Sequence, residues 1–227
     1  MEFSAEQDQV WATLITNQLP KVKQHACSLY LDGYSRLQLP ADRIPSLPEL
    51  NDEITPRTGW RAVRTGERYS DAVPWYQAFA GKQFLVTDYM RGWEELEFTP
   101  EPDMFHDIFG HLPFMTIPEY TELQELFAPA FEKANADQRE DIKRLAWFST
   151  EFGLILENGE MKAFGAGLIS SMAELENVAQ RKVPFEPFTF ENVTRFDKAV
   201  WSFNEVMFYF DSIESLKAEL GGYFTRL

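Results

Sequence analysis

Apolar residues recur at three- and four-residue intervals over much of this chain, which is the spacing of one buried face of an α-helix. The first such segment follows Ser4–Gln7, whose residue types form a helix N-terminal capping box. Its apolar positions are Val10, Trp11, Leu14 and Ile15. We expect Pro20 to interrupt this helix, because proline lacks the N–H group, and a second helix to continue to about Tyr34.

The same periodicity predicts helices along the rest of the chain. Thr99 and Pro100 have the residue types of a helix cap and a first helical position. Another helix is expected from Pro118 to about Ala134. The capping box at 137–140 predicts the next one, which continues through Leu156. Two more are expected, one beginning at 171–174 and one from Ser212 to Leu220 that ends at Gly221.

Strand signals are few. Residues 83–89 and 206–210 are the clearest candidates, and the Pro-rich stretch 39–56 reads as an irregular but ordered connection. No internal repeat or domain boundary is evident. The sequence therefore predicts a mainly α fold (α+β with a few short strands), with residues 1–227 forming one helical domain. Residues 1–57 would supply N-terminal helices and the Pro-rich connection, packed on the core.

Composition excludes some classes of protein. The apolar fraction is 44% and the aromatic fraction 15%, with 20 Phe among 227 residues, which is enough for a large core rich in rings. A formal net charge of −15 disfavours nucleic acids and anionic membrane surfaces, whose phosphates attract clustered Lys and Arg. The single cysteine, Cys27, excludes an internal disulfide and is expected to be a small buried side chain.

The N-terminus lacks the basic and apolar regions of a signal peptide, and no apolar run is long enough to cross a membrane. We therefore expect a soluble, cytoplasmic protein.

The clearest chemical signal is a pair of histidines, His106 and His111, among only three in the chain. On an unbroken α-helix, residues five apart diverge by about 140°. We therefore expect the helix to end between them at Gly110, with Pro113 following, so that both imidazoles can bind one metal ion.

Glu151 is a plausible third ligand, because it lies in the most apolar part of its predicted helix and would need a cation there. Two histidines and one carboxylate form the facial triad of non-haem Fe(II) oxygenases. Asp107 could accept a hydrogen bond at this site or orient a bound water molecule. A pair of buried histidines without a metal, or a hydrolytic zinc site, are the alternatives that the residues alone leave open.

At these residues the chain resembles the pterin-dependent aromatic amino acid hydroxylases. The resemblance is carried by Thr99–Asp103, His106–His111, Trp147–Gly153 and Lys162–Ser171, and it is strongest from about Thr58 to Glu174. It implies a catalytic domain of that type, without regulatory or tetramerisation segments, and hence a monomer.

The resemblance implies that His106, His111 and Glu151 bind Fe(2+), and that a tetrahydropterin supplies electrons to O2 for hydroxylation of the ring of a free aromatic amino acid. L-Phenylalanine, converted to tyrosine, is the expected substrate. The positions that match the family's substrate-binding residues are Arg91, Thr99, Pro100, Trp147, Gly167 and Ser170. Those expected to contact the pterin are Gly66, Tyr69, Trp75 and Asp107.

The pterin segment departs from the family pattern. Charged residues at 64–68 replace an apolar glycine-containing loop, and Pro74 followed by Trp75 stands where many members have a pterin-stacking phenylalanine. One hypothesis is that Arg64 or Arg68 selects a pterin with a more polar side chain, and the other is that these charges face solvent. Two functional alternatives also remain: another aromatic substrate or electron donor at the same iron site, or an inactive homologue that binds an amino acid or metal.

Overall fold

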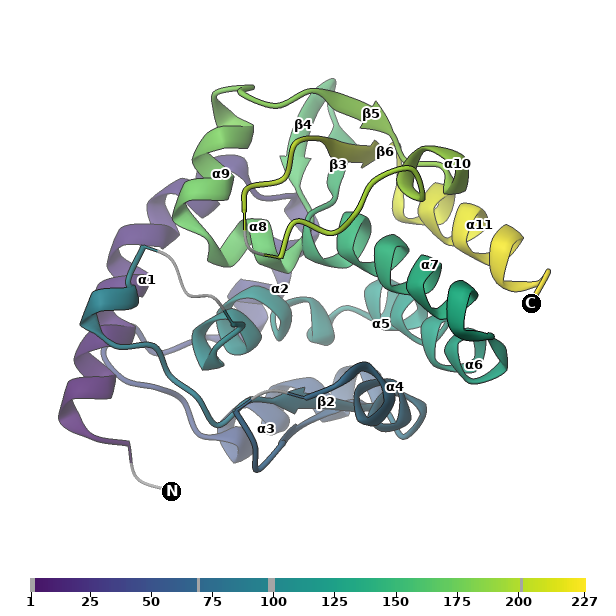
Figure 1. The fold of residues 1–227 in the computed structure, drawn as a ribbon. Helices are drawn as coiled ribbons and strands as arrows, with labels where there is room; N and C mark the ends of the chain where they lie inside the picture. The colour runs from purple at the N-terminus through teal and green to yellow at the C-terminus, as the bar shows by residue number, and fades with distance from the viewer. Residues whose placement is uncertain (1–2, 69, 98–100, 201) are drawn as a thin grey trace.

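The protein is described here from a computed structural model that covers residues 3–68, 70–97, 101–200 and 202–227. Helices predominate and the strands are short, so the predicted fold class is confirmed. In Figure 1 a long helix, α1 (Ala5–His25), follows one side of the molecule, a small two-stranded sheet lies at the bottom, and a four-stranded sheet lies at the top. The helices between the two sheets carry the residues expected to form the site.

The N-terminal helices show where the prediction for proline was wrong. Ser4 caps α1 with the predicted capping box, but α1 continues through Pro20 to His25. Buried Gln18 and Val22 lie on either side of Pro20 and keep the helix packed, which outweighs the one missing N–H donor. The break instead falls before α2 (Ser28–Leu37), at Cys27, which is buried as expected.

The Pro-rich connection is shorter than predicted, because its second half forms α3 (Leu47–Thr58). Ser46 caps this helix and Pro48 lies in its first turn, where an N–H group is not needed. Strand β1 (Arg61–Arg64) follows and pairs in parallel with β2 (Gln83–Val86), which is the first predicted strand in shortened form. Helix α4 (Ala72–Ala80), absent from the prediction, connects the two strands.

The middle of the chain is more segmented than the periodicity suggested. The predicted helix 118–134 is two helices, α5 (Pro118–Gln124) and α6 (Phe127–Lys133). The next helix, α7 (Ala136–Ala146), begins earlier than predicted, because Asn135 and Gln138 form its capping box. Shorter helical turns are η1 (Trp93–Glu95) and η3 (Phe114–Thr116).

The last part of the chain forms the four-stranded sheet, in the order β4-β3-β6-β5. Leu156, predicted to be helical, lies in a strand. Ser171 caps its helix as predicted, and the final helix continues through Gly221 because buried Leu220 and Tyr223 anchor both sides of that glycine. The elements are β3 (Leu154–Glu157), β4 (Glu160–Ala163), α8 (Ala166–Ser170), α9 (Met172–Ala179), β5 (Phe185–Pro187), α10 (Phe190–Val193), β6 (Met207–Phe210) and α11 (Ile213–Phe224).

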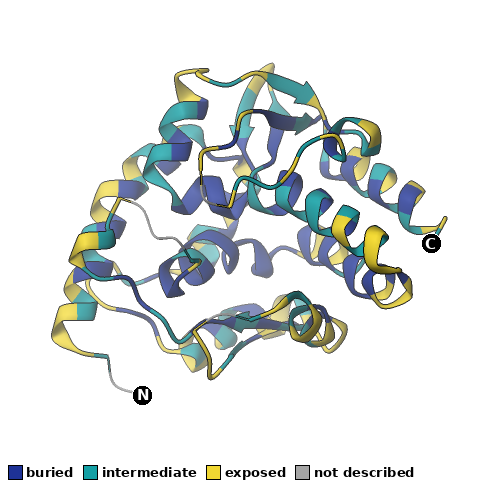
Figure 2. Ribbon diagram, in the orientation of Figure 1, coloured by how far each residue is buried: buried dark blue, intermediate teal, exposed yellow. Residues whose placement is uncertain are grey.

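One hydrophobic cluster connects these layers, from Val10 in α1 to Tyr223 in α11. Figure 2 shows that its most buried part is the centre of the molecule, where α8 lies, while the outer faces of α1 and α7 are exposed. The segment with the two histidines packs directly against α8. None of the described helices combines the length and apolarity needed to cross a membrane.

Candidate active site

The two histidines lie at the ends of a π-helical segment, η2 (His106–His111). Its helical backbone begins at Met104, and the Asp103 carboxylate accepts a hydrogen bond from the backbone N–H of His106 (3.0 Å). Asp103 therefore acts as the cap. The predicted cap and first position, Thr99 and Pro100, lie outside the described residues, and residues 101–103 are not helical.

The π-helix, not a helix end, brings the histidines together. In a π-helix each N–H group bonds to the carbonyl five residues earlier, as the Leu112 N–H does to the Asp107 carbonyl (3.2 Å). Residues five apart then share a face. The prediction that the helix stops at Gly110 was wrong. Gly110 is needed for close packing, because an added Cβ would lie 2.8 Å from the Ala166 carbonyl oxygen of α8.

Glu151 is the last residue of a second π-helical segment, η4 (Trp147–Glu151), which continues α7. The Phe152 N–H bonds to the Trp147 carbonyl (2.8 Å), again five residues earlier. The chain folds back tightly here, since a Cβ on Gly165 would lie 2.1 Å from the Glu151 carbonyl oxygen. Two widened helices and one glycine contact thus place the carboxylate opposite the imidazoles.

The three side chains converge on one point. His111 Nε2 lies 3.1 Å from His106 Nε2 and 3.1 Å from Glu151 Oε1, and His106 Nε2 lies 3.5 Å from Glu151 Oε2. Atoms that bind one metal ion at about 2.1 Å are about 3.0 to 3.4 Å apart for angles between octahedral and tetrahedral. Among the described residues, this is the one group of three whose ligand atoms all lie within 4.8 Å of one another.

The electrostatics fit a metal ion. Burial and the neighbouring His111 lower the pKa of His106 to about 4, so its imidazole is neutral and has a lone pair available at neutral pH. Burial opposes ionisation of Glu151, but His111 outweighs it and brings the pKa of Glu151 below its ordinary value. Two imidazole nitrogens and a carboxylate in contact need a shared cation.

Ser170 orients His106. The Ser170 hydroxyl donates to the Ala166 carbonyl (2.8 Å), so it accepts the hydrogen bond from His106 Nδ1 (2.8 Å). The proton is therefore on Nδ1, and Nε2 is free to bind a metal. Ser170 was predicted to bind substrate, and the contact that the structure shows is with the metal-site residue His106.

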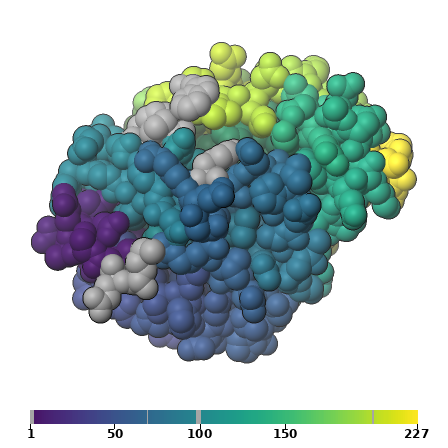
Figure 3. Space-filling model, turned by 60° about the horizontal axis from the view of Figure 1, so that its bottom comes forward, coloured from purple at the N-terminus to yellow at the C-terminus, as the bar shows by residue number. Residues whose placement is uncertain are grey.

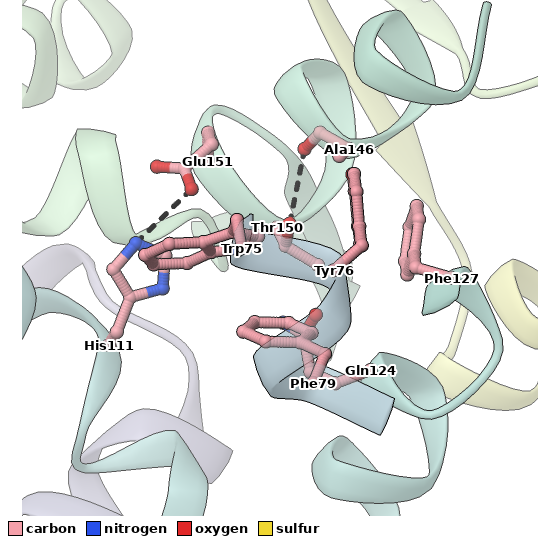
Figure 4. Close-up of a pocket in the computed structure, with 9 residues that line it drawn as sticks. All are labelled: Trp75, Tyr76, Phe79, His111, Gln124, Phe127, Ala146, Thr150 and Glu151. Carbon is pink, nitrogen blue, oxygen red and sulfur yellow. Dashed lines mark hydrogen bonds and ion pairs between the residues drawn. The ribbon is translucent and has the colours of Figure 1, made fainter. Parts of the chain in front are cut away.

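A cavity of about 620 Å³ opens onto the three ligands. Figure 3 looks onto this face, where the blue segment with α4, the green α7 and the yellow-green segment before β6 approach one another. A smaller cavity of about 100 Å³ adjoins it. Figure 4 shows His111 and Glu151 turned toward each other at its edge, with the rings of α4 and Phe127 beside them.

Arg91 lines the main cavity and is 5% exposed. Its Nε and Nη2 atoms each lie 2.8 Å from an oxygen of Asp103, which is fully buried, and the Arg91 backbone N–H also bonds to Asp103. This bidentate pair fixes the guanidinium plane. Nη1 has no hydrogen-bond partner among the described residues, and it is the group left to bind an anion in the cavity.

Trp147 and Gly167 also line the main cavity. The Trp147 ring packs on Phe152 with 4.6 Å between ring centroids, and its indole N–H donates to Asn204 Oδ1 (2.9 Å). A Cβ on Gly167 would lie 2.6 Å from the Phe152 ring. The glycine therefore lets α8 approach this pair of rings, and the three residues together form an apolar side of the cavity.

The predicted pterin residues separate into two groups. Trp75 and Asp107 line the main cavity. Asp107 accepts a hydrogen bond from the Thr87 N–H (2.8 Å) and not from His106, and burial raises its pKa well above the ordinary value. Gly66 lies in a left-handed turn (φ 74°) and is not one of the lining residues, and Tyr69 lies outside the described residues. Pterin contacts at these positions stay predictions.

Neither arginine of the altered loop lines the cavity. Arg64 is paired with Asp88, and Arg68 is paired with Glu101 (2.6 Å) and lies over the Tyr89 ring, 3.7 Å from its centroid. The loop presents Thr65 and nearby small polar side chains to the cavity instead. Selection of a pterin by Arg64 or Arg68 therefore receives no support from their contacts.

The whole chain, residues 1–227, matches the family model described as biopterin-dependent aromatic amino acid hydroxylase. The chain belongs to this family. The resemblance predicted from the motifs is confirmed, and membership in a family of hydroxylases sets aside the hydrolytic zinc alternative.

Relatives of the family agree with this assignment. The chain is 35% identical to a phenylalanine-4-hydroxylase of Vibrio cholerae over 86% of this chain and 68% of the relative. It is 34% identical to one of Mesorhizobium japonicum over 95% of this chain and 79% of the relative.

Solved structures in the family share the fold. The apo phenylalanine hydroxylase of Colwellia psychrerythraea matches with a TM-score of 0.91 and 28% identity, covering 100% of this chain and 90% of the other. That of Chromobacterium violaceum with bound iron(III) and 7,8-dihydrobiopterin matches with a TM-score of 0.91 and 30% identity, covering 99% and 82%.

Two residues of the site were missed by the sequence reasoning. Asp103 was noted as part of a motif, without a role, yet it caps η2 and orients Arg91. An acidic residue three positions before a helical His is a cap signal that would have revealed the first role. Asn204 gave no local signal, because its contact with Trp147 joins residues 57 positions apart.

Proposed function

We propose that this chain is an iron(II)- and tetrahydropterin-dependent monooxygenase that hydroxylates the ring of L-phenylalanine to give tyrosine. The observation that carries the proposal is the convergence of His106, His111 and Glu151 at the cavity that also contains Arg91. Family membership supports the pterin, and the relatives that are named phenylalanine hydroxylases support the substrate.

The residues of the cavity can hold an aromatic amino acid. Nη1 of Arg91 binds the carboxylate, because Asp103 occupies the other edge of the guanidinium and keeps it in one orientation. Trp147 and Phe152 provide an apolar surface for the side-chain ring. A ring held between these groups and the metal ligands is positioned for reaction, which is the main contribution that binding makes to rate.

The remaining residues hold the cofactors. His106, His111 and Glu151 would hold the iron, with Ser170 keeping His106 in the tautomer whose Nε2 faces it. Trp75 lines the cavity and offers an aromatic ring for the pterin. When bound, iron and pterin supply the activation of O2: the pterin gives two electrons, one oxygen atom enters the ring and the other is reduced.

The test is turnover with identified products. Protein reconstituted with Fe(II) and a reduced pterin is incubated with L-phenylalanine, L-tyrosine or L-tryptophan, and the products are analysed by mass spectrometry. We expect tyrosine from phenylalanine. Hydroxylation of tryptophan or tyrosine at a higher kcat/KM would replace the substrate, and oxygen consumption without a hydroxylated amino acid would contradict the proposal. Tight amino acid binding without oxygen consumption would indicate an inactive homologue.

We also propose that residues 1–227 act as one catalytic domain that is a monomer in the cytoplasm. The continuous hydrophobic cluster from α1 to α11 supports one domain. Sedimentation velocity at several protein concentrations tests the monomer, and a concentration-dependent increase in mass would overturn it.

A further inference from the structure

Glu174 is a buried carboxylate of the main cavity whose bonding is incomplete. It is 5% exposed and lies in the first turn of α9. Its Oε1 atom accepts hydrogen bonds from the backbone N–H (3.0 Å) and the side-chain amide (2.8 Å) of Asn204. Its Oε2 atom has no hydrogen-bond partner among the residues that the structure describes. A buried carboxylate oxygen without a donor is costly, so a ligand that supplies one would be stabilised there.

The helix cap does not use this side chain. Ser171 and Glu174 have the residue types and spacing of a capping box, and the Ser171 hydroxyl does accept from the Glu174 N–H (3.3 Å). The reciprocal bond is absent, because the Ser171 N–H donates to the Gly167 carbonyl (3.1 Å). The Glu174 carboxylate instead extends to Asn204, which in turn binds the Trp147 indole N–H. It is thus held at the cavity by the residue that also orients Trp147.

Glu174 differs from the other carboxylates that line the cavity. Glu151 belongs to the metal site, Asp107 accepts from Thr87, and Glu101 is paired with Arg68. Asp71 and Glu97 are exposed, so water satisfies them. No lysine or arginine of the described residues forms an ion pair with Glu174, and burial raises its pKa. Among the described residues, Glu174 and Asp107 are therefore the buried carboxylates of this cavity that have neither a metal nor a cationic partner, and Glu174 is the one held beside Trp147 through Asn204.

We propose that Glu174 accepts the α-ammonium group of the amino acid substrate, an inference that rests on the proposed function. A free amino acid carries a carboxylate and an ammonium group on one carbon, and burying the ammonium requires an opposite charge. Arg91 takes the carboxylate and Glu174 takes the ammonium. Rotation about the last side-chain bond of glutamate is soft, so the carboxylate can turn an oxygen toward the ligand. Glu174 then selects free amino acids over acids that lack the amino group.

The experiment compares two ligands that differ only in the ammonium group. Binding of L-phenylalanine and of 3-phenylpropionate is measured by calorimetry on the iron(II)-loaded protein, under nitrogen and without pterin, so that no turnover occurs. The parent protein is expected to bind L-phenylalanine about tenfold or more tightly than 3-phenylpropionate. Glu174→Gln, which keeps the size and an oxygen for Asn204, is expected to weaken L-phenylalanine about tenfold or more and leave 3-phenylpropionate unchanged.

Glu176→Gln is the matched control, because Glu176 lies on the same helix, is 40% exposed and pairs with Lys21 outside the cavity. It should keep the parent's affinity for both ligands. Equal weakening of both ligands in Glu174→Gln would reduce Glu174 to a structural role and overturn the inference. Should Glu174→Gln not fold, the parent alone decides: equal affinity for the two ligands overturns the inference. Binding of neither ligand by the parent would overturn the proposed function, and the inference with it.

Discussion

The metal side of the cavity and its loop side are built differently. On the metal side, η2, η4 and α8 pack so closely that glycines are required at Gly110 and Gly165, and Ser170 fixes the His106 ring. On the loop side, Arg64 and Arg68 pair with carboxylates at or near the surface, and short polar side chains such as that of Thr65 line the cavity. The metal side therefore allows few substitutions, whereas the loop side can vary with little effect on the metal ligands.

The largest effect is expected from removing a metal ligand. Glu151→Ala leaves two imidazoles, which bind a divalent ion weakly, so iron content should fall from about one per chain to near zero and hydroxylation should be lost, by more than about a hundredfold. Iron is measured by mass spectrometry after gel filtration. Glu160→Ala, an exposed carboxylate nearby in sequence, should retain full iron. Full iron in Glu151→Ala would refute the assignment.

The next largest effect is expected from removing the hydrogen bond that orients His106. Ser170→Ala removes the acceptor for His106 Nδ1, and loss of such a supporting bond typically lowers metal affinity about 10- to 100-fold. Ser171→Ala is the control, because the Ser171 hydroxyl lines the cavity but bonds to the Glu174 N–H of α9 and to no metal ligand. Its loss should cost about 1 kcal/mol of stability with no change in metal affinity. Competition with a coloured chelator gives both affinities. Equal metal affinity in the two variants would show that the hydroxyl does not orient the ring.

Asp103 caps η2 and also holds Arg91, so its replacement is expected to weaken binding of the amino acid substrate. Asp103→Asn keeps the shape but removes the charge that holds Arg91, so KM for the amino acid should rise about tenfold while KM for the pterin is unchanged. Steady-state kinetics measures both constants. Thermal melting checks that the Asp103→Asn protein still folds with Arg91 buried and without its carboxylate partner. A change in the pterin KM alone would contradict this role for the pair.

The smallest effect is expected on the loop side. Arg68→Ala and Arg64→Ala break pairs with Glu101 and Asp88, and the order of preference among several tetrahydropterins should be that of the parent, with kcat/KM within about twofold. A reordering of cofactors in either variant would show that the loop charges act in selection. The comparison of the two sides would then no longer hold.

The sequence predicted the chemistry better than the backbone that produces it. The three metal ligands were expected from their residue types and from the family resemblance, and Arg91, Trp147 and Ser170 from the resemblance alone. All six line the main cavity. The path of the backbone was less predictable. Pro20 lies within a helix because distant packing holds it there, and η2 widens instead of ending at Gly110. Local propensity does not report such long-range contacts.

Contacts between residues far apart in the sequence also could not be predicted from it. Asn204 contacts Trp147 and Glu174, which are 57 and 30 positions away, and nothing around residue 204 marks it as part of the site. The prediction that a helix begins at 171–174 was right, and it could not show that the Glu174 side chain bonds to Asn204.

The two π-helical segments have a consequence for how such a site can originate. A π-helical turn is an α-helix with one extra residue, so a three-base insertion into the gene of an ordinary helical protein is enough to create one. Both η2 and η4 carry metal ligands, and in each the added residue rotates everything after it by about 100° relative to an α-helix. Before such an insertion His106 and His111 would stand four residues apart, a spacing that already places both on one face of an α-helix, so a single-codon deletion at Ile108 is expected to keep the two histidines together.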